Sequence, residues 1–365
     1  MDKSIEFAAQ PVPKHVGDFL QHLKARQTTP GYRAQVAMRL GRMLRGLRVQ
    51  RITDINVTAT EALLIEFCAS GIPDRCLSAD ELAGESESAR QRRLRAKSSK
   101  TRDDYLDSLR HFCRWLVIHG RLHANPLASI SKLCSPSHPE ATATFVRRAM
   151  TTDEFARLVD AAVRRGVENK LQANPRTPVH VLQELRIRGE ARALAYVLAG
   201  TLGVRQKALW SIQWGDLDLE ASVLRLQAAY AKNRREARPD MPEWLRDQFV
   251  AWRSRMAGHL RREPLASERV FCLLPVPKNI KRLMDKDLEF AGIERCSGRE
   301  RIDFHALKTY ASTRLYEADV DPRVSAMLTA TTAPVMQQRY ARMGPSQGKE
   351  AVARLDRPAI LPMQA

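Results

Sequence analysis

The sequence lacks the features of several large protein classes. No run approaches the roughly 20 uninterrupted apolar residues that cross a bilayer, and the N-terminal residues do not show the basic and then apolar pattern of a secretory signal. The cysteines are widely spaced and form no C-x-x-C pair, so they indicate reduced packing residues and exclude a zinc ribbon or a disulfide-rich secreted fold. These absences predict a cytoplasmic protein with no membrane partner. The cysteines are Cys68, Cys76, Cys113, Cys134, Cys272 and Cys296.

Acidic residues are also in short supply. The 365 residues contain 60 Lys and Arg against 41 Asp and Glu, which gives a formal net charge of +19. A polyanion is then the expected partner, because lysine and arginine release counterions when they neutralise phosphates. The sequence shows no P-loop, acidic metal cluster or Cys/His cluster, so it predicts no cofactor, metal or nucleotide.

The length and the apolar pattern predict two domains. Residues 14–68 and 101–118 repeat apolar residues at helical spacing, and Thr58 begins a capping box that predicts a helix start there. These segments predict a helical domain over 14–135. A linker over 136–149 follows, because this stretch contains two prolines and small polar residues.

The second domain, over 150–345, is predicted to mix helices with a little sheet. A capping box at Thr151 opens one helix, and residues 184–200 form another. Alternating apolar residues from Ser222 to Ala229 predict a hairpin, and with it a small sheet near 210–240. The expected fold class is therefore mainly α with a small β-sheet (α+β).

Basic residues gather in the first domain. A run without any acid occupies a polar insertion at about 84–100, which is either a face that tracks phosphates or a disordered insertion. The helix over 101–118 adds further arginines. The expected phosphate contacts are Arg90, Arg92, Arg93, Arg95, Lys97, Lys100, Arg102, Arg110 and Arg114.

Three segments of the second domain contain residues able to act on a phosphodiester. Arg205 follows a glycine at a helix junction, and Lys232 lies in a basic turn. His305 and Lys308 lie one turn apart, so both can face one ligand. Tyr340 lies further on, between two arginines. Each feature alone is a weak signal, because a tyrosine in a helix usually packs in the core and basic turns are commonly solvated.

Together these segments resemble the tyrosine recombinases, the phage integrase family. TLGVRQKALWSIQWGDLDLE follows the family's Gly-Leu-Arg helix and places its first catalytic arginine on Arg205. The hairpin lysine falls on Lys232, HALKTYASTRLYEADVDP places the family histidine on His305, and QQRYAR places the nucleophile on Tyr340. Upstream, TRDDYLDSLRHFCRWLVIHGRLHANPL looks like the last helices of the family's core-binding domain.

The resemblance implies a site-specific recombinase or integrase of a mobile genetic element. Such an enzyme cleaves and rejoins double-stranded DNA through a 3′-phosphotyrosyl bond, acts as a homo-tetramer on paired sites and closes two domains around the duplex. Forked guanidinium groups suit the phosphate oxygens, and a lysine can protonate the leaving 5′ oxygen. The implied order is an N-terminal tail (1–13), a core-binding domain (14–135), a linker (136–149), a catalytic domain (150–345) and a C-terminal tail (346–365). Arg234, Arg235 and Arg339 join the expected DNA contacts.

Three positions depart from the family pattern. Lys308 replaces the second arginine and loses the bidentate fork, Thr331 (or Ala330, one register away) replaces the usual His or Trp, and Ala208 replaces an acidic residue. Three interpretations therefore stay open. The first is an active recombinase, and the second is a relative that occupies recombination sites without cutting them. The third is a basic helical protein that binds nucleic acid without sequence preference.

Overall fold

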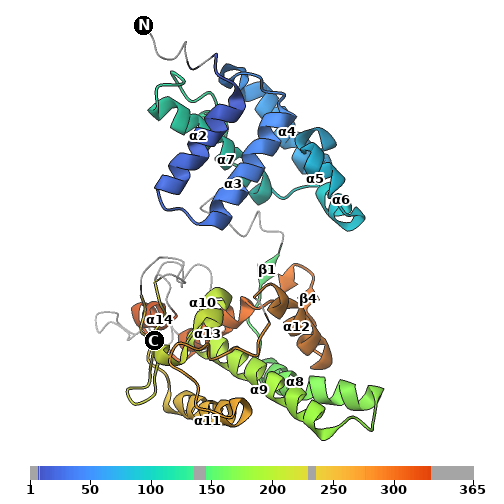
Figure 1. Cartoon of the computed structure of the whole chain (residues 1–365), viewed down its shortest axis with the longest axis vertical. Coiled ribbons are helices and arrows are strands. Elements are labelled where there is room, and N and C mark those ends of the chain that lie inside the picture. The colour runs from blue at the N-terminus through green and yellow to red at the C-terminus, as the bar shows by residue number, and fades with distance from the viewer. Residues whose placement is uncertain (1–6, 8, 135–144, 229–235, 276, 330–365) are drawn as a thin grey trace, which may run out of the picture. The chain divides into compact units, whose positions relative to one another are not determined.

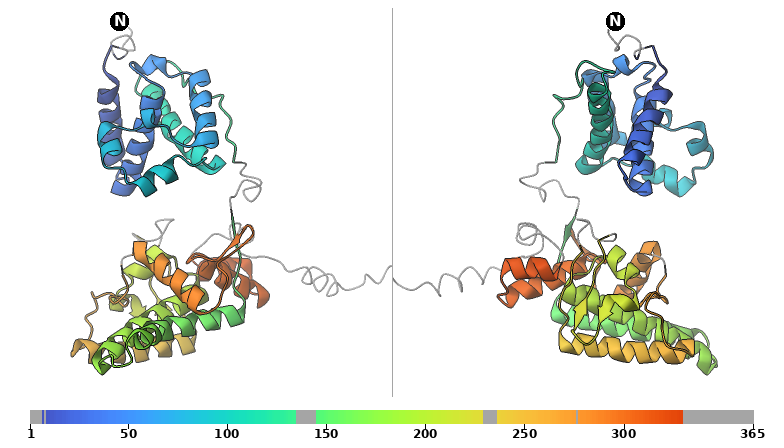
Figure 2. Two further views of the ribbon diagram at one scale, coloured as in Figure 1. Left: turned by 90° about the vertical axis from the view of Figure 1, so that its right-hand side faces the viewer. Right: turned by 60° about the vertical axis from the view of Figure 1, so that its left-hand side comes forward.

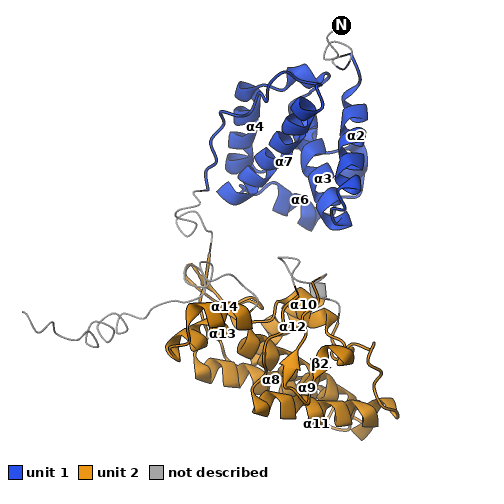
Figure 3. Ribbon diagram, turned by 90° about the vertical axis from the view of Figure 1, so that its left-hand side faces the viewer, with its two compact units in different colours: residues 1–144 blue, residues 145–365 orange. Residues whose placement is uncertain are grey.

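The chain forms two compact units, residues 1–144 and 145–365, which Figure 3 shows in blue and orange. The division falls inside the segment that the sequence predicts to be a linker. No helix in the part of the chain that the structure describes is long and apolar enough to cross a membrane. The computed structural model describes residues 7, 9–134, 145–228, 236–275 and 277–329.

The first unit is helical throughout its described residues. Phe19, Phe67 and Phe112 are completely buried and come from three different helices, so aromatic side chains hold the core of this unit together. The helices, labelled in Figure 1, are α2 (Val12–Ala25), α3 (Pro30–Gly46), α4 (Val57–Ser70), α5 (Ala79–Ala83), α6 (Glu87–Arg93) and α7 (Ser99–Ile118).

The predicted helices 14–68 and 101–118 are confirmed, with one error at a boundary. Helix α4 begins at Val57, and its N-cap is Asn56, whose side chain accepts from the Ala59 N–H at 2.9 Å. Thr58 therefore lies inside the first turn and is not the cap. Asn and Thr both favour the N-cap position, and the chain uses the asparagine that comes first.

The insertion at about 84–100 is folded, so the alternative of a disordered insertion is wrong. Arg93 is 6% exposed, and its guanidinium donates to Glu85, Asp74 and the carbonyl of Ile72. Arg93, which the sequence analysis expects to contact phosphates, thus anchors the insertion to the rest of the unit.

The second unit combines helices with two small sheets (Figure 1), which confirms the predicted fold class. Its helices are α8 (Thr152–Ala173), α9 (Val179–Leu202), α10 (Gln206–Ser211), α11 (Glu243–Leu260), α12 (Pro277–Phe290), α13 (Ala306–Glu317) and α14 (Pro322–Leu328), and its strands are β1 (Val146–Arg147), β2 (Leu217–Asp218), β3 (Val223–Leu224), β4 (Cys296–Ser297) and β5 (Glu300–Arg301).

Helices α8 and α9 are the long elements of this unit and pack side by side (Figure 2). The predicted capping box opens α8, since Thr151 accepts from the Glu154 N–H and Glu154 accepts from the Thr151 N–H. A Cβ at Gly189 would lie 2.7 Å from the Ala162 carbonyl oxygen, so a glycine is required where the two helices touch.

The two sheets differ in how far the sequence predicts them. Strands β2 and β3 pair antiparallel within the expected 210–240 region. The other sheet, in the order β1-β5-β4, was not predicted, because its two-residue strands carry no periodic signal. Strand β1 pairs parallel with β5 and lies within the expected linker, so the last residues of that segment belong to the second unit.

A buried carboxylate joins three helices of the second unit. Asp287 on α12 is 0% exposed and accepts from Arg165 Nε at 2.6 Å, Arg192 Nε at 3.0 Å and Tyr196 Oη at 2.8 Å. Arg165 belongs to α8, while Arg192 and Tyr196 belong to α9. The position of α9, whose end leads into the arginine at 205, therefore depends on one ion-pair network.

We predict that Asp287→Asn destabilises the second unit by about 3–5 kcal/mol, because it leaves two buried guanidinium groups without a counter-charge. Urea unfolding followed by tryptophan fluorescence tests this, since four of the five tryptophans lie in this unit. Asp160→Asn is the matched control: its side chain is 57% exposed and pairs with Arg164, so its loss costs about 1 kcal/mol or less. Equal effects of the two variants would contradict the assignment.

Candidate active site

The first element of the candidate site is the turn between α9 and α10. Gly203 ends α9 in the left-handed region at φ 62°, and Arg205 precedes the first residue of α10. A Cβ at Gly203 would lie 3.1 Å from two side-chain carbons of Thr329 and 3.4 Å from Lys308 Cγ. The positive φ at position 203 favours glycine. The close approach of α13 and of the end of α14 leaves little room for a side chain there.

His305 lies at the start of α13. Its backbone N–H donates to Asp303 Oδ1 at 2.9 Å, which fixes the first turn of the helix. Burial, followed by the positive charge of Arg147, lowers the pKa of His305 to about 4. The imidazole is therefore neutral at pH 7, and one ring nitrogen can accept a proton while the other donates.

Lys308 lies one turn further along α13 and is 1% exposed. Its ammonium donates to the carbonyl oxygen of Gly203 at 3.2 Å and to that of Thr329. It thus links α13 to the turn between α9 and α10, which we call the arginine turn, and to the end of α14. Burial, with the charge of Arg205, lowers the pKa of Lys308 to about 7.

Arg205, His305 and Lys308 form what we call the site cluster. Lys308 donates to the carbonyl of Gly203, two residues before Arg205, and His305 lies one turn earlier in the chain than Lys308, so the three residues lie together although Arg205 is a hundred residues from His305 in sequence. The charge of Arg205 lowers the pKa of both His305 and Lys308. A group of cations with a neutral imidazole favours an anion such as a phosphodiester. Among the residues that the structure describes, no group of three His, Cys, Asp or Glu could hold a metal ion.

Several predicted site residues lie outside the described part of the chain. They are Lys232, Arg234, Arg235, Ala330, Thr331, Arg339 and Tyr340.

Ala208, one of the departures from the family pattern, is described. It lies on α10 and is 8% exposed, and as an alanine it offers no carboxylate to the neighbouring Arg205.

The predicted DNA contacts of the first unit divide into two groups. Arg93, Arg102 and Arg110 bond within the protein: Arg102 to Asp103 and to the Ser131 carbonyl, and Arg110 to carbonyls of the turn after α7. We leave these three out of the proposed contacts, because Arg93 and Arg102 are buried and Arg110 donates to several backbone carbonyls. The other side chains are exposed or half-buried, although Arg92, Lys97 and Lys100 also bond to neighbouring residues. They are Arg90, Arg92, Arg95, Lys97, Lys100 and Arg114.

Two residues beside His305 were missed by the sequence analysis. Asp303 accepts two hydrogen bonds from Arg147 Nε, at 2.9 and 3.1 Å. The signal for Asp303 was its place two residues before His305. Arg147 is 156 residues away in sequence, and nothing in its local pattern points to this pairing.

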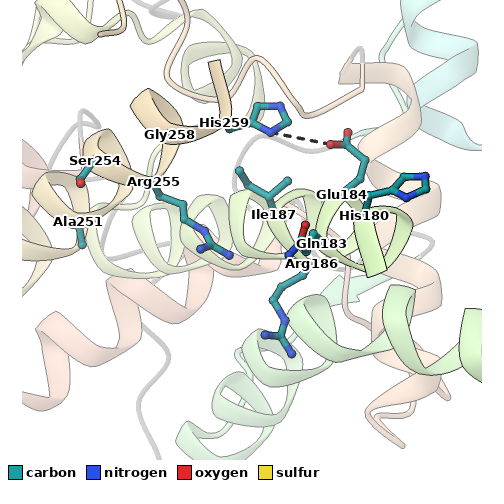
Figure 4. Close-up of a pocket in the computed structure, with 10 residues that line it drawn as sticks. All are labelled: His180, Gln183, Glu184, Arg186, Ile187, Ala251, Ser254, Arg255, Gly258 and His259. Atoms are coloured by element: carbon teal, nitrogen blue, oxygen red, sulfur yellow. Dashed lines mark ion pairs between the residues drawn. The ribbon is translucent and has the colours of Figure 1, made fainter. Parts of the chain in front are cut away.

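A groove of about 720 Å³ lies between α9 and α11, with the side chains shown in Figure 4. Its walls mix Arg186 and Arg255 with Glu184, which lies 3.9 Å from His259 Nδ1. The groove uses the first turns of α9, so roughly 20 Å of helix separates it from Arg205. It is therefore distinct from the site cluster.

The comparison with known families agrees with this geometry. The model of the "Phage integrase family" matches residues 149–346, more than half of the chain. The chain therefore belongs to the phage integrase family, the tyrosine recombinases. No curated protein matches it.

Solved structures of integrases share the fold. A lambda integrase dimer bound to a COC′ core site is 15% identical with a TM-score of 0.59, and the match covers 98% of this chain and 82% of that chain. A lambda integrase tetramer bound to a Holliday junction is 15% identical with a TM-score of 0.59, covering 94% and 82%. The Tn1549 transposon integrase in complex with transposon right end DNA is 14% identical with a TM-score of 0.58, covering 95% and 99%.

We predict that the buried Lys308 makes stability rise with pH above neutrality. Between its folded pKa of about 7 and its ordinary value of 10.5, the unfolded chain binds a proton that the folded chain does not, so raising the pH favours folding. The neutral amine still has two N–H donors for the two carbonyls. From pH 7 to 9.5 the free energy of unfolding should rise by on the order of 3 kcal/mol more in the wild type than in Lys308→Met.

Urea unfolding at a series of pH values measures this difference. The exposed Lys170→Met is the matched control and should follow the wild-type curve. If Lys308→Met also follows the wild type across this pH range, Lys308 does not lose its proton on folding.

Proposed function

We propose that this protein is a site-specific DNA recombinase that cuts and rejoins strands through a 3′-phosphotyrosyl bond at Tyr340, without metal or nucleotide. The observation that supports the proposal is the site cluster: Lys308 on α13 donates to the carbonyl of Gly203, two residues before Arg205, and His305 lies one turn before Lys308, all within the region that matches the phage integrase family. The net charge of +19 is consistent with a DNA substrate.

The proposed cleavage step is a transfer of the phosphoryl group between two oxygens. The Tyr340 hydroxyl oxygen attacks phosphorus, and the bond from phosphorus to the 5′ oxygen breaks. Lys232 gives a proton to the leaving 5′ oxygen. The neutral imidazole of His305 accepts the proton of the tyrosine, whose pKa near ~10 keeps it un-ionised at pH 7. Rejoining is the same step in reverse with another 5′ hydroxyl.

The charge of the cluster suits the transition state. Negative charge grows on the non-bridging phosphate oxygens during attack, and Arg205 offers a planar fork that matches two oxygens. Lys308 supplies a second positive charge when it is protonated. Since its ammonium bonds to two carbonyl oxygens, its contribution to the phosphate is indirect and works through the position of Arg205.

The first unit is proposed to hold double-stranded DNA by phosphate contacts. Its exposed basic side chains on α6 and just beyond include Arg90 and Arg95. A homo-tetramer on paired DNA sites is proposed by analogy with the lambda integrase tetramer bound to a Holliday junction.

A second candidate is a relative that binds recombination sites without cutting them. The observation that favours it is the orientation of Lys308: where the family has a phosphate-binding arginine, this ammonium bonds to the protein backbone. If the lost bidentate contact stabilises the transition state by about 1–3 kcal/mol, its absence lowers the rate of cleavage by about ten- to a hundredfold. This loss alone slows cleavage but does not abolish it.

We predict a covalent protein–DNA adduct with nicked suicide substrates in EDTA, using fragments of the chromosome and of the mobile element that flank the gene. The adduct should survive denaturant and be absent in Tyr340→Phe. Arg205→Lys should reduce its rate by about a hundredfold or more, because it removes a bidentate contact to the transition state.

The outcomes separate the two candidate functions. An adduct in the wild type that also persists in Tyr340→Phe would rule out this nucleophile. No adduct together with tight, sequence-dependent binding would favour the relative that binds without cutting.

We further predict that Arg90→Ala with Arg95→Ala weakens DNA binding and lowers the slope of log affinity against log salt by about 2, close to 0.9 per lost phosphate contact. Titration of a labelled duplex at several salt concentrations measures the slope. Arg164→Ala is the matched control, since this exposed arginine pairs with both Asp160 and Glu168. A slope that the double variant leaves unchanged would exclude α6 from the DNA interface.

A further inference from the structure

The strand that opens the second unit runs beside the segment that leads into His305. Val146 pairs with Glu300 and Arg147 with Arg301. The Val146 N–H donates to the Arg299 carbonyl at 2.8 Å, and the Arg148 N–H donates to the Arg301 carbonyl at 3.3 Å. Backbone bonds therefore hold β1 in a defined register beside the residues that lie four to six positions before the histidine.

The side chain of Arg147 extends this contact to the histidine turn. Its Nε donates to both carboxylate oxygens of Asp303, and Asp303 Oδ1 also accepts the N–H of His305. The Asp303 side chain is 15% exposed and that of Arg147 is 38% exposed, so the carboxylate is the better shielded half of the pair. Phe145 lies under the guanidinium of Arg147 and that of Arg301, each 5.1 Å from the ring centre. Arg147 is thus held by an aromatic face and a carboxylate together.

We propose that Arg147 is a positioning residue for His305. It holds the Asp303 carboxylate, the carboxylate holds the first turn of α13, and that turn aims the imidazole into the site cluster. The inference rests on the proposed function, because it assigns Arg147 to the site in which His305 acts. It adds a side chain from the first strand of the second unit to a site otherwise built from α9, α10 and α13.

The charges around His305 give Arg147 a second effect. The groups that face the imidazole are Arg147 from β1, Asp303 from its own turn, Lys308 from α13 and Arg205 from the arginine turn. Burial acts most strongly, Arg147 follows, and both lower the pKa of His305, whereas Asp303 raises it. Removing Arg147 takes away a repelling cation and leaves the Asp303 carboxylate unbalanced, so both changes favour the protonated imidazole.

The test is the pKa of His305, measured by NMR on the full chain with labelled histidine and assigned with His305→Gln. In Arg147→Met the pKa should rise by about one unit. Arg147→Gln, which keeps a donor for Asp303 but loses the charge, provides a second variant with the same expected direction. Arg148→Met is the matched control, because Arg148 is the next residue and its ion pair with Glu154 is of similar length. It should leave the pKa of His305 unchanged.

The rate of covalent adduct formation gives an independent readout. It should fall about tenfold or more in Arg147→Met and recover in part in Arg147→Lys, which restores the charge. An unchanged pKa of His305 in both Arg147→Met and Arg147→Gln overturns the proposal. The NMR measurement needs no DNA, so an absent wild-type adduct with a shifted histidine pKa would reject the recombinase function and leave the Arg147 contact standing.

Discussion

The buried carboxylate of Asp287 is the constraint on which the second unit depends. It holds two arginines and a tyrosine that lie on α8 and α9, and it lies on α12 itself. Burying a charge is unfavourable unless it is paired, and Asp287 and Arg192 are buried while Arg165 is 13% exposed. The pairing therefore favours the observed packing of the three helices, together with the apolar core that they share. Helix α9 ends at Leu202 and leads directly into Gly203 and Arg205. The position of the arginine turn thus follows from the position of α9.

The site itself carries an excess of positive charge. Arg205, Lys308 and Arg147 all act on the same histidine, and both His305 and Lys308 have pKa values well below their ordinary ranges. Like charges held together in a half-buried place raise the free energy of the unbound protein, and a bound phosphate would lower it. This charge distribution supports the proposed anion site, and the amine of Lys308 is directed toward two backbone carbonyls.

The sequence was sufficient for the features that depend on local pattern. The helix α7, the capping box at Thr151 and the α+β class follow from spacing and caps. The family motifs predict Arg205 and His305 in one site, and the hydrogen bond from Lys308, one turn after His305, to the carbonyl of Gly203 joins the segments that carry them.

Features that depend on distant partners were not predictable. The sheet of β1, β5 and β4 uses strands of two residues, which have no period to detect. Arg93 reads as one member of a basic run, and its burial follows from acceptors on Asp74 and Glu85. The orientation of Lys308 toward two carbonyls depends on the close approach of Gly203 and Thr329, which no local pattern encodes.

The proposed covalent bond between DNA and Tyr340 is tested most directly by mass spectrometry of the wild-type protein after reaction with suicide substrates, followed by nuclease and protease digestion. We expect the peptide containing Tyr340 to gain the mass of a 3′-linked nucleotide phosphate. A nucleotide on any other residue, or on none while the substrate is cut, would contradict it.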